Sequence, residues 1–187
     1  MAEKPLANRW FTPSMVLIGA AALGVVSTAE QTPTDTAPVA VAELKSPEGD
    51  RIGRAELRDT PSGVLVRLAL ENAPTGVHAF HLHETGRCDA PSFESAGGHF
   101  NPSTAEHGFE NAKGPHAGDL PNVHIPASGT LEIEVLAHAA LRGTAGLLDG
   151  DGSAIVLHGG ADDYSTDPAG GAGPRVACGV LTPGIDR

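Results

Sequence analysis

Short runs that alternate between hydrophobic and polar residues fill most of the chain after residue 38. This period of two residues is typical of β-strands with one buried face, and no long stretch follows a helical period. The pattern predicts strands at residues 39–44, 52–58, 64–70, 77–83, 122–125, 131–136, 153–158 and 176–181, with a hairpin turn at residues 59–63. We therefore expect an all-β domain with a closed or sandwiched antiparallel sheet.

Two long segments, residues 84–120 and 159–174, do not alternate in this way. Structureless loops of such length are uncommon in a compact domain unless they carry function. The first segment holds most of the proposed metal ligands, described below. We expect bound metal and a disulfide to order these loops, because hydrophobic burial cannot.

The first 29 residues have the tripartite form of an export signal, with Lys4 and Arg9, an apolar stretch over residues 16–26 and small residues at 27–29. We expect cleavage after Ala29, a disordered leader over residues 30–37 and one domain over residues 38–187. The alternative is an uncleaved membrane anchor, although the apolar run is about half of the roughly 20 residues that span a bilayer. The predicted location is periplasmic.

Charge and cysteine content narrow the possible partners and the compartment. The net charge of −11 becomes −12 when Glu3, Lys4 and Arg9 leave with the signal, and such acidity argues against nucleic acid as a partner. The only cysteines are Cys88 and Cys178. In an oxidising compartment this distant pair is expected to form a structural disulfide. Closing a loop of about ninety residues stabilises the fold by roughly 4–5 kcal/mol in the chain-entropy model.

Histidines and one aspartate occur at spacings suited to metal ions. His81 and His83 are two residues apart on a predicted strand, so both face the same side. Other histidines and Asp119 follow in the first long segment, and His158 ends a later strand. Imidazole suits copper and zinc, and three imidazoles with one carboxylate make a closed tetrahedral zinc set. The pattern predicts one site of each kind, whereas an isolated His-x-His pair would fit a surface strand equally well.

Six segments resemble copper,zinc superoxide dismutases of the bacterial exported type: GVHAFHLHETGRC, SAGGHFNP, HG, GPHAGDLPNVHIP, DGDGSAIVLHGGADDY and GPRVACGV. They occur in the family's order and spacing from about residue 38 to the C-terminus. The resemblance implies an eight-stranded antiparallel Greek-key β-barrel or sandwich of immunoglobulin-like form, with long metal-binding and electrostatic loops. It also implies an antioxidant enzyme that converts superoxide to O2 and hydrogen peroxide by Cu(II)/Cu(I) cycling.

The resemblance also assigns roles to individual residues. Copper is expected at His81, His83, His99 and His158, and zinc at His99, His107, His116 and Asp119. His99 then binds both ions through a deprotonated imidazole. Asp162 matches a carboxylate that links a copper ligand to a zinc ligand, and Arg175 matches the arginine that attracts the anion beside copper. His78 is expected to hydrogen-bond backbone, and His124 and His138 to be surface or strand residues.

Some features remain open at this level. The segment 159–174 carries no lysine, so Arg87 and Lys113 are the candidates for steering superoxide. The resemblance also implies that His99 delivers a proton to the second superoxide. The main alternative is a copper or zinc storage or delivery protein of the same fold, and a further one is an adhesive or structural β-sandwich. The mature form is expected to have no membrane partner and to be a monomer or homodimer.

Overall fold

The computed structural model describes residues 39–184, so the predicted signal peptide and leader lie outside the described residues. Its strands are β1 (Ala40–Lys45), β2 (Arg51–Thr60), β3 (Gly63–Leu70), β4 (Gly76–His78), β5 (Phe80–His83), β6 (Val123–Ile125), β7 (Leu131–Ala137), β8 (Ala154–His158), β9 (Arg175–Val180) and β10 (Thr182–Pro183). The one helical element in this range is a 3-10 turn, η1 (Glu94–Ala96). Within residues 39–184, no helix has the length and apolar character needed to cross a membrane.

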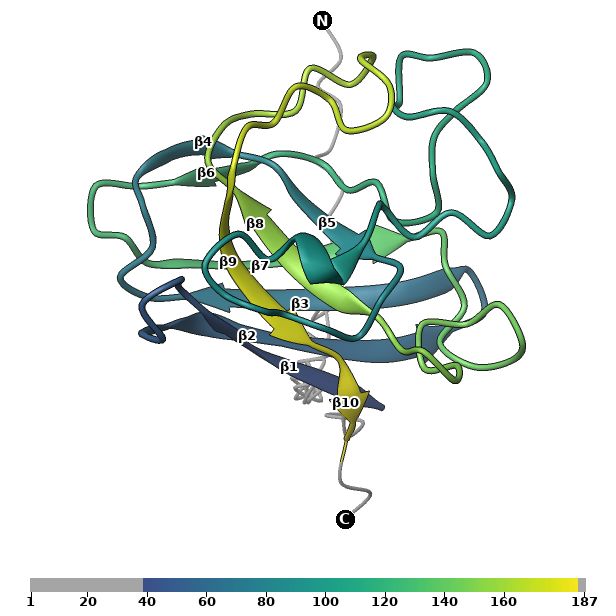
Figure 1. Ribbon diagram of the computed structural model, residues 1–187, viewed down its shortest axis with the longest axis horizontal. Coiled ribbons are helices and arrows are strands. Elements are labelled where there is room, and N and C mark those ends of the chain that lie inside the picture. Colours follow the sequence, from purple (N-terminus) through teal and green to yellow (C-terminus); the bar gives the residue numbers. More distant parts are fainter. Residues whose placement is uncertain (1–38, 185–187) are drawn as a thin grey trace, which may run out of the picture. The chain divides into compact units, whose positions relative to one another are not determined.

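The main sheet is antiparallel throughout and curls around the core (Figure 1). Its order is β5-β8-β9-β1-β2-β3-β7, with β10 paired to the start of β1. The β2–β3 hairpin turns at the predicted place, with Thr60 opposite Gly63. The predicted all-β class and antiparallel sheet are therefore confirmed, and the chain's first and last strands are neighbours.

The prediction of a single strand at residues 77–83 is wrong, because the chain changes its pairing strand at Ala79. β4 pairs with β6 in a separate two-stranded sheet, whereas β5 pairs with β8 in the main sheet. Between them, Ala79 donates its N–H to the carbonyl of Gly160 and accepts the N–H of His158, both at 2.8 Å. Two apolar residues in a row, Ala79 and Phe80, interrupt the alternation here, but such a break does not reveal which strand each half pairs with.

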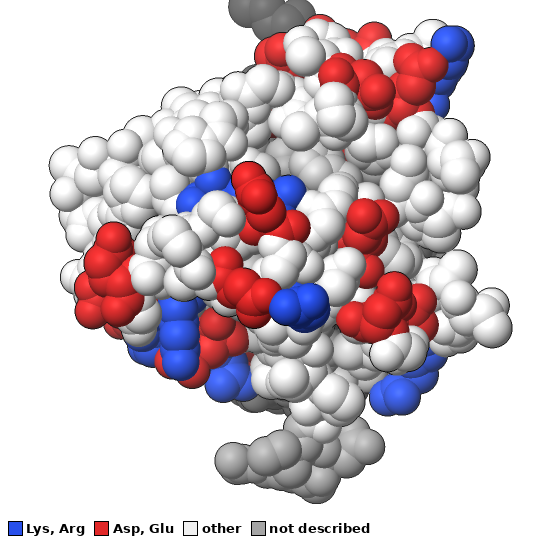
Figure 2. Space-filling model, in the orientation of Figure 1, with Lys and Arg blue, Asp and Glu red and all other residues white. Residues whose placement is uncertain are grey.

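Alternating residues of the first three strands build the hydrophobic core. Ala42 and Leu44 on β1, Leu57 on β2, and Val66 and Leu68 on β3 are buried. The opposite faces of β2, β3 and β7 carry exposed ion pairs, including Arg67 with Glu132 and Arg58 with Glu134. Figure 2 shows basic side chains beside acidic ones on the visible face. Such surface pairs contribute little individually, so the fold depends mainly on the buried face.

Strands β5 and β8 differ from the others because every residue in them is buried. Phe80 and Leu82 of β5 belong to the main core, while His81 and His83 point to the other face. On β8, Ala154 and Val156 pack against Phe93 in a second, smaller cluster. The segments predicted as long loops cover both strands. In Figure 1 the loop of residues 159–174 lies at the top of the view, whereas part of the loop of residues 84–120, including η1, lies in front of the sheet in the middle.

Candidate metal centre

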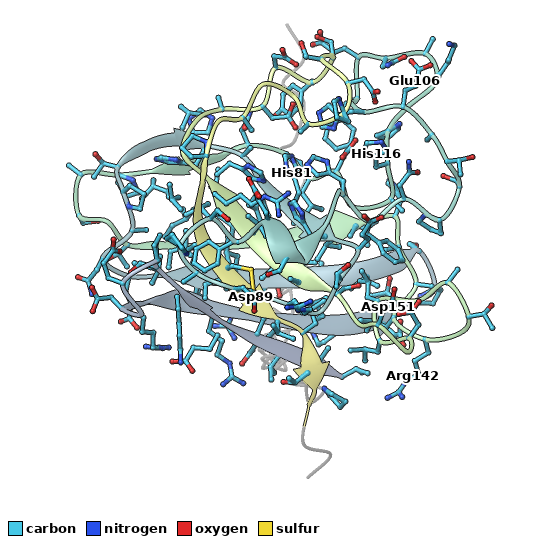
Figure 3. The ribbon with its side chains drawn as sticks, in the orientation of Figure 1. His81, Asp89, Glu106, His116, Arg142 and Asp151 are labelled. Carbon is cyan, nitrogen blue, oxygen red and sulfur yellow. A yellow bond between two sulfur atoms is a disulfide. The ribbon has the colours of Figure 1, made fainter. Side chains whose placement is uncertain are left out.

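Four histidines from three parts of the chain meet above the sheet. His81 and His83 lie on β5, and His158 ends the neighbouring strand β8. His99 joins them because its residue forms an isolated bridge with His83. One ring nitrogen from each lies within 4.8 Å of the others, and all four residues are buried. Figure 3 shows His81 between the sheet and the loops above it.

Three of these imidazoles are held by one nitrogen and leave the other without a partner, and neither ring nitrogen of His158 has a partner among the described residues. His81 Nε2 donates to Asp162 Oδ2 at 2.8 Å, and His83 Nδ1 donates to the carbonyl of Gly97 at 3.0 Å. The nitrogens without a hydrogen-bond partner among the described residues include His81 Nδ1, His83 Nε2, His99 Nε2 and His158 Nε2. Orphaned buried polar atoms are costly, so four converging ones fit a metal ion. Imidazole nitrogen is a donor that copper accepts readily.

A second set of groups converges on one oxygen of Asp119. His99 Nδ1, His107 Nδ1 and His116 Nδ1 lie 2.8, 3.1 and 3.2 Å from Asp119 Oδ1. The other oxygen, Oδ2, accepts the backbone N–H groups of Gly108 and His116, which fixes the carboxylate plane. Three imidazoles and one carboxylate gathered at one point are the donor set of a closed tetrahedral zinc site.

Asp162 connects the two sets. Its Oδ2 accepts from His81, and its Oδ1 accepts from His107 Nε2 at 3.0 Å. The Tyr164 N–H also donates to Oδ1, at 2.7 Å. A Cβ added to Gly170, whose φ is +63°, would lie 2.0 Å from Oδ1, so the backbone passes directly over this carboxylate. The carboxylate therefore has a single position, set from several sides.

Burial keeps most of these imidazoles neutral. It lowers the pKa of His99 to about 4, that of His158 to about 3, and that of His83 well below its usual range. Burial also acts to lower the pKa of His107, but the hydrogen bonds that its ring donates to Asp119 and Asp162 outweigh burial and raise that pKa to about 9. Neutral imidazoles keep a lone pair available, which is the form that binds metal.

The two carboxylates stay ionised in the same buried environment. Burial by itself would raise the pKa values of Asp119 and Asp162, but the hydrogen bonds that His107 and a second histidine donate to each hold both pKa values well below their usual range. The site therefore combines the neutral imidazoles of His83, His99 and His158 with a protonated His107 and two buried negative charges.

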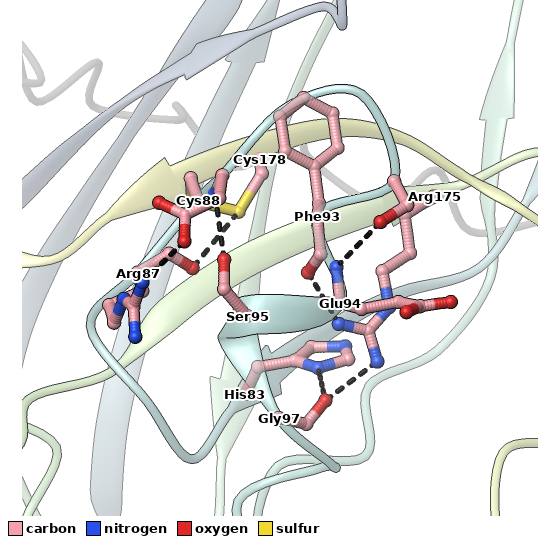
Figure 4. Close-up of a disulfide and its surroundings, with 11 residues drawn as sticks. His83, Arg87, Cys88, Phe93, Glu94, Ser95, Gly97, Arg175 and Cys178 are labelled. Atoms are coloured by element: carbon pink, nitrogen blue, oxygen red, sulfur yellow. Dashed lines mark hydrogen bonds and ion pairs between the residues drawn. A yellow bond between two sulfur atoms is a disulfide. The ribbon is translucent and has the colours of Figure 1, made fainter.

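Arg175 reaches the same place from the start of β9. A cleft of about 610 Å³ is lined by His83, His99, His158 and Arg175, among others. The guanidinium donates to the carbonyls of Phe93 at 2.7 Å and Gly97 at 2.6 Å, as Figure 4 shows. The backbone loop that bears both carbonyls was not identified from the sequence, because a carbonyl carries no residue-type signal.

The predicted disulfide is present and secures that loop. Cys88 and Cys178 are bonded, with Cα atoms 5.7 Å apart. Cys178 lies on β9, three residues after Arg175, and packs with Phe93 in the smaller hydrophobic cluster. The crosslink thus joins the strand that carries the guanidinium to the loop that orients it (Figure 4).

The two steering candidates lie elsewhere and are engaged by acids. Arg87 pairs with Asp89 at 2.5 Å, and Lys113 pairs with Glu106 at 2.7 Å. Figure 3 shows Glu106 at the outer edge of the loops. Of the lysines and arginines in residues 39–184, Arg175 alone lines the cleft. The basic group at the cleft is therefore Arg175, whereas Arg87 and Lys113 lie outside its lining.

The remaining histidines are separate from the metal sets. His78 Nδ1 donates to the carbonyl of His158 at 2.8 Å, so it supports the end of β8 through the backbone as expected. His124 and His138 are exposed.

Taken together, a curled antiparallel sheet and two buried donor sets that share His99 define a dinuclear metalloprotein of the β class. The family model for copper/zinc superoxide dismutase matches residues 52–181. A Cu-Zn superoxide dismutase of Aquifex aeolicus is 48% identical over 144 residues, which cover 75% of this chain and 85% of that protein. A Cu-Zn superoxide dismutase of Caulobacter vibrioides is 41% identical over 170 residues, which cover 88% of this chain and 98% of that protein.

A solved structure agrees with these matches. The crystal structure of a SOD-like protein from Bacillus subtilis has a TM-score of 0.73 and 39% identity, covering 76% of this chain and 97% of that one. The chain belongs to the copper/zinc superoxide dismutase family. Its cofactors are copper and zinc, which the two donor sets fit.

Acid should destabilise the metal-free protein. The folded-state pKa values of His99 and His158 lie below the ordinary 6.5, so the unfolded chain takes up protons first as pH falls. The stability that His99 and His158 contribute is lost as the pH falls from about 6.5 to 3. The contribution of His107 to stability changes with pH in the opposite direction. Because its pKa is raised, that contribution is complete below pH 6.5 and is lost as the pH rises through about 9. Denaturant unfolding of metal-free protein should show a lower midpoint at pH 4.5 than at pH 6.5, and a rise would contradict this assignment.

Proposed function

We propose that this protein disproportionates superoxide, with copper held by His81, His83, His99 and His158 and zinc by His99, His107, His116 and Asp119. Two superoxide anions and two protons give one O2 and one hydrogen peroxide. Copper supplies the Cu(II)/Cu(I) couple that takes an electron from one superoxide and returns it to the next, while zinc keeps one oxidation state and orders its ligands. The observation that carries the proposal is the shared His99.

His99 is the residue through which protons reach the substrate. Its Nδ1 faces Asp119 in the zinc set, and its Nε2 belongs to the copper set without another partner among residues 39–184. A ring held at Nδ1 can gain and lose a proton at Nε2 without turning. We assign to Nε2 the proton that is delivered to the second superoxide in the cleft.

Arg175 binds the anion. Two of its N–H groups are committed to the carbonyls of Phe93 and Gly97, which fixes the guanidinium plane. A guanidinium has five N–H donors, so others remain for a small anion in the cleft. The charge is permanent, and it lies beside His83 and His158. Arg175 therefore both attracts superoxide and orients it toward the copper set.

Export to the periplasm is part of the proposal. It is supported by the signal-like residues 1–29, by the bacterial relatives and by the Cys88–Cys178 disulfide, which is typical of oxidising compartments. The leader over residues 30–37 would then precede the catalytic domain of residues 38–187, acting in antioxidant defence of the cell envelope as a monomer or homodimer. The mature chain should begin at Glu30, which N-terminal sequencing of the periplasmic fraction would establish. Recovery of the uncleaved chain in membranes would favour the anchor instead.

His81→Ala tests the copper assignment. The change removes one copper ligand and the bond to Asp162, so copper content and superoxide scavenging should both fall, the latter roughly a hundredfold or more. Metal analysis should find one copper and one zinc per chain in the unchanged protein. The exposed His124→Ala is the matched control and should keep both metals and the rate. Full metal occupancy without turnover in the unchanged protein would instead indicate a storage or delivery protein.

Arg175→Ala tests the substrate-binding role. Loss of a charge-assisted contact worth about 1.5–3 kcal/mol should slow scavenging about 10- to 100-fold, with metal content unchanged. Added salt should slow the unchanged protein more than the variant, because salt screens the guanidinium charge. Arg175→Lys should recover part of the rate. Equal rates and equal salt dependence in all three proteins would rule out the role.

A further inference from the structure

Tyr164 has a backbone conformation that needs an explanation. It lies between Asp162 and the end of the loop of residues 159–174, with φ at +62°. A bulky residue other than glycine rarely adopts the left-handed region, and does so only where surrounding contacts hold it there. Tyr164 is also half-buried and is the only tyrosine in the sequence.

Four contacts hold Tyr164 in place. Its N–H donates to Asp162 Oδ1 at 2.7 Å, and its carbonyl accepts the N–H of Glu110 at 3.0 Å. Its hydroxyl accepts the N–H of Asn122 at 2.7 Å. Its ring contacts that of Phe109, with centroids 5.5 Å apart. One residue thus touches its neighbour Asp162 and two segments that are distant in the sequence.

Two of these contacts reach the chain next to zinc-set residues. Glu110 follows His107 by three residues, and Asn122 follows Asp119 by three. Between His107 and Glu110 the chain approaches closely, because a Cβ on Gly108 would lie 2.0 Å from the Tyr164 carbonyl oxygen. Tyr164 therefore fixes the loop of residues 159–174 against both sides of the zinc set.

The same contacts determine where Asp162 lies. The Asn122 side chain bonds to Asp162 through a reciprocal pair, with Nδ2 donating to the Asp162 carbonyl and Oδ1 accepting its N–H, both at 2.8 Å. The Tyr164 hydroxyl holds the backbone of that same asparagine. Asp162 in turn accepts from His107 Nε2. A continuous path of hydrogen bonds runs from the phenol to a ring of the zinc set.

We propose that Tyr164 is a positioning residue that slows the loss of zinc by fixing Asp162 and, through it, the ring of His107. The inference rests on the proposed assignment of zinc to His99, His107, His116 and Asp119. Tyr164 is not among the residues that line the cleft, so it does not act on superoxide directly.

Tyr164→Phe removes only the hydroxyl. In protein loaded with copper and zinc, transfer of zinc to an excess of a chromogenic chelator should be roughly tenfold faster than in the unchanged protein, because Asn122 loses its partner and Asp162 its fixed position. Thr166→Val is the matched control. It deletes another hydroxyl of the same loop, whose bond goes to Asp163 at 2.5 Å, and it should leave zinc release unchanged. Equal release from all three proteins would overturn the proposal.

A double-mutant cycle separates positioning from general loosening of the fold. If the phenol acts through Asp162, Tyr164→Phe should add little to the faster release already caused by Asp162→Ala, or by Asp162→Asn where the alanine variant retains too little zinc. If the effects of the two substitutions on zinc release are fully additive, the effect of the phenol is merely structural and the proposal is overturned.

Superoxide scavenging is measured separately on the same loaded proteins. Faster zinc release in the Tyr164 variant, together with no scavenging by the unchanged protein, would support the positioning role while refuting the dismutase function. Normal scavenging by the unchanged protein, together with zinc release from the variant that is no faster, would support the dismutase function and refute the positioning role.

Discussion

The burial of six imidazoles and two carboxylates under loops with almost no regular structure is the constraint on which the rest of this protein depends. Buried polar groups must find partners, and here Asp119 and Asp162 supply them for both donor sets. His81 and His107 lie on different segments, yet the same carboxylate holds both. Metal and carboxylates together thus replace the hydrophobic burial that these loops lack.

The strand pair β8–β9 places three functional parts at once. β8 ends in His158, and β9 begins with Arg175 and continues to Cys178. The disulfide from Cys178 secures the loop whose carbonyls orient the guanidinium. A short piece of sheet therefore sets the distance between His158 and Arg175, and the crosslink ties β9 to the loop of residues 84–120.

The sequence predicted what is encoded locally and failed where long-range contacts decide. Alternation located the strands, and histidine spacing identified residues that the fold brings together. The change of partner at Ala79 depends on a carbonyl eighty residues away in the sequence, at Gly160, and no local pattern reports it. Arg87 and Lys113 were reasonable steering candidates by charge, but neighbouring acids engage them. The contacts of Tyr164 were equally invisible, because its partners at Glu110 and Asn122 are backbone groups of distant segments.

The position of β1 next to β9 and β10 has a consequence for how the molecule is made. The first strand of the sheet can complete its pairing only when the C-terminal strands exist, and closing so long a loop delays folding. His158 and Arg175 belong to that late part of the chain. During synthesis the four-histidine donor set therefore stays incomplete until residue 158 has emerged, so a partly finished chain cannot assemble the complete set.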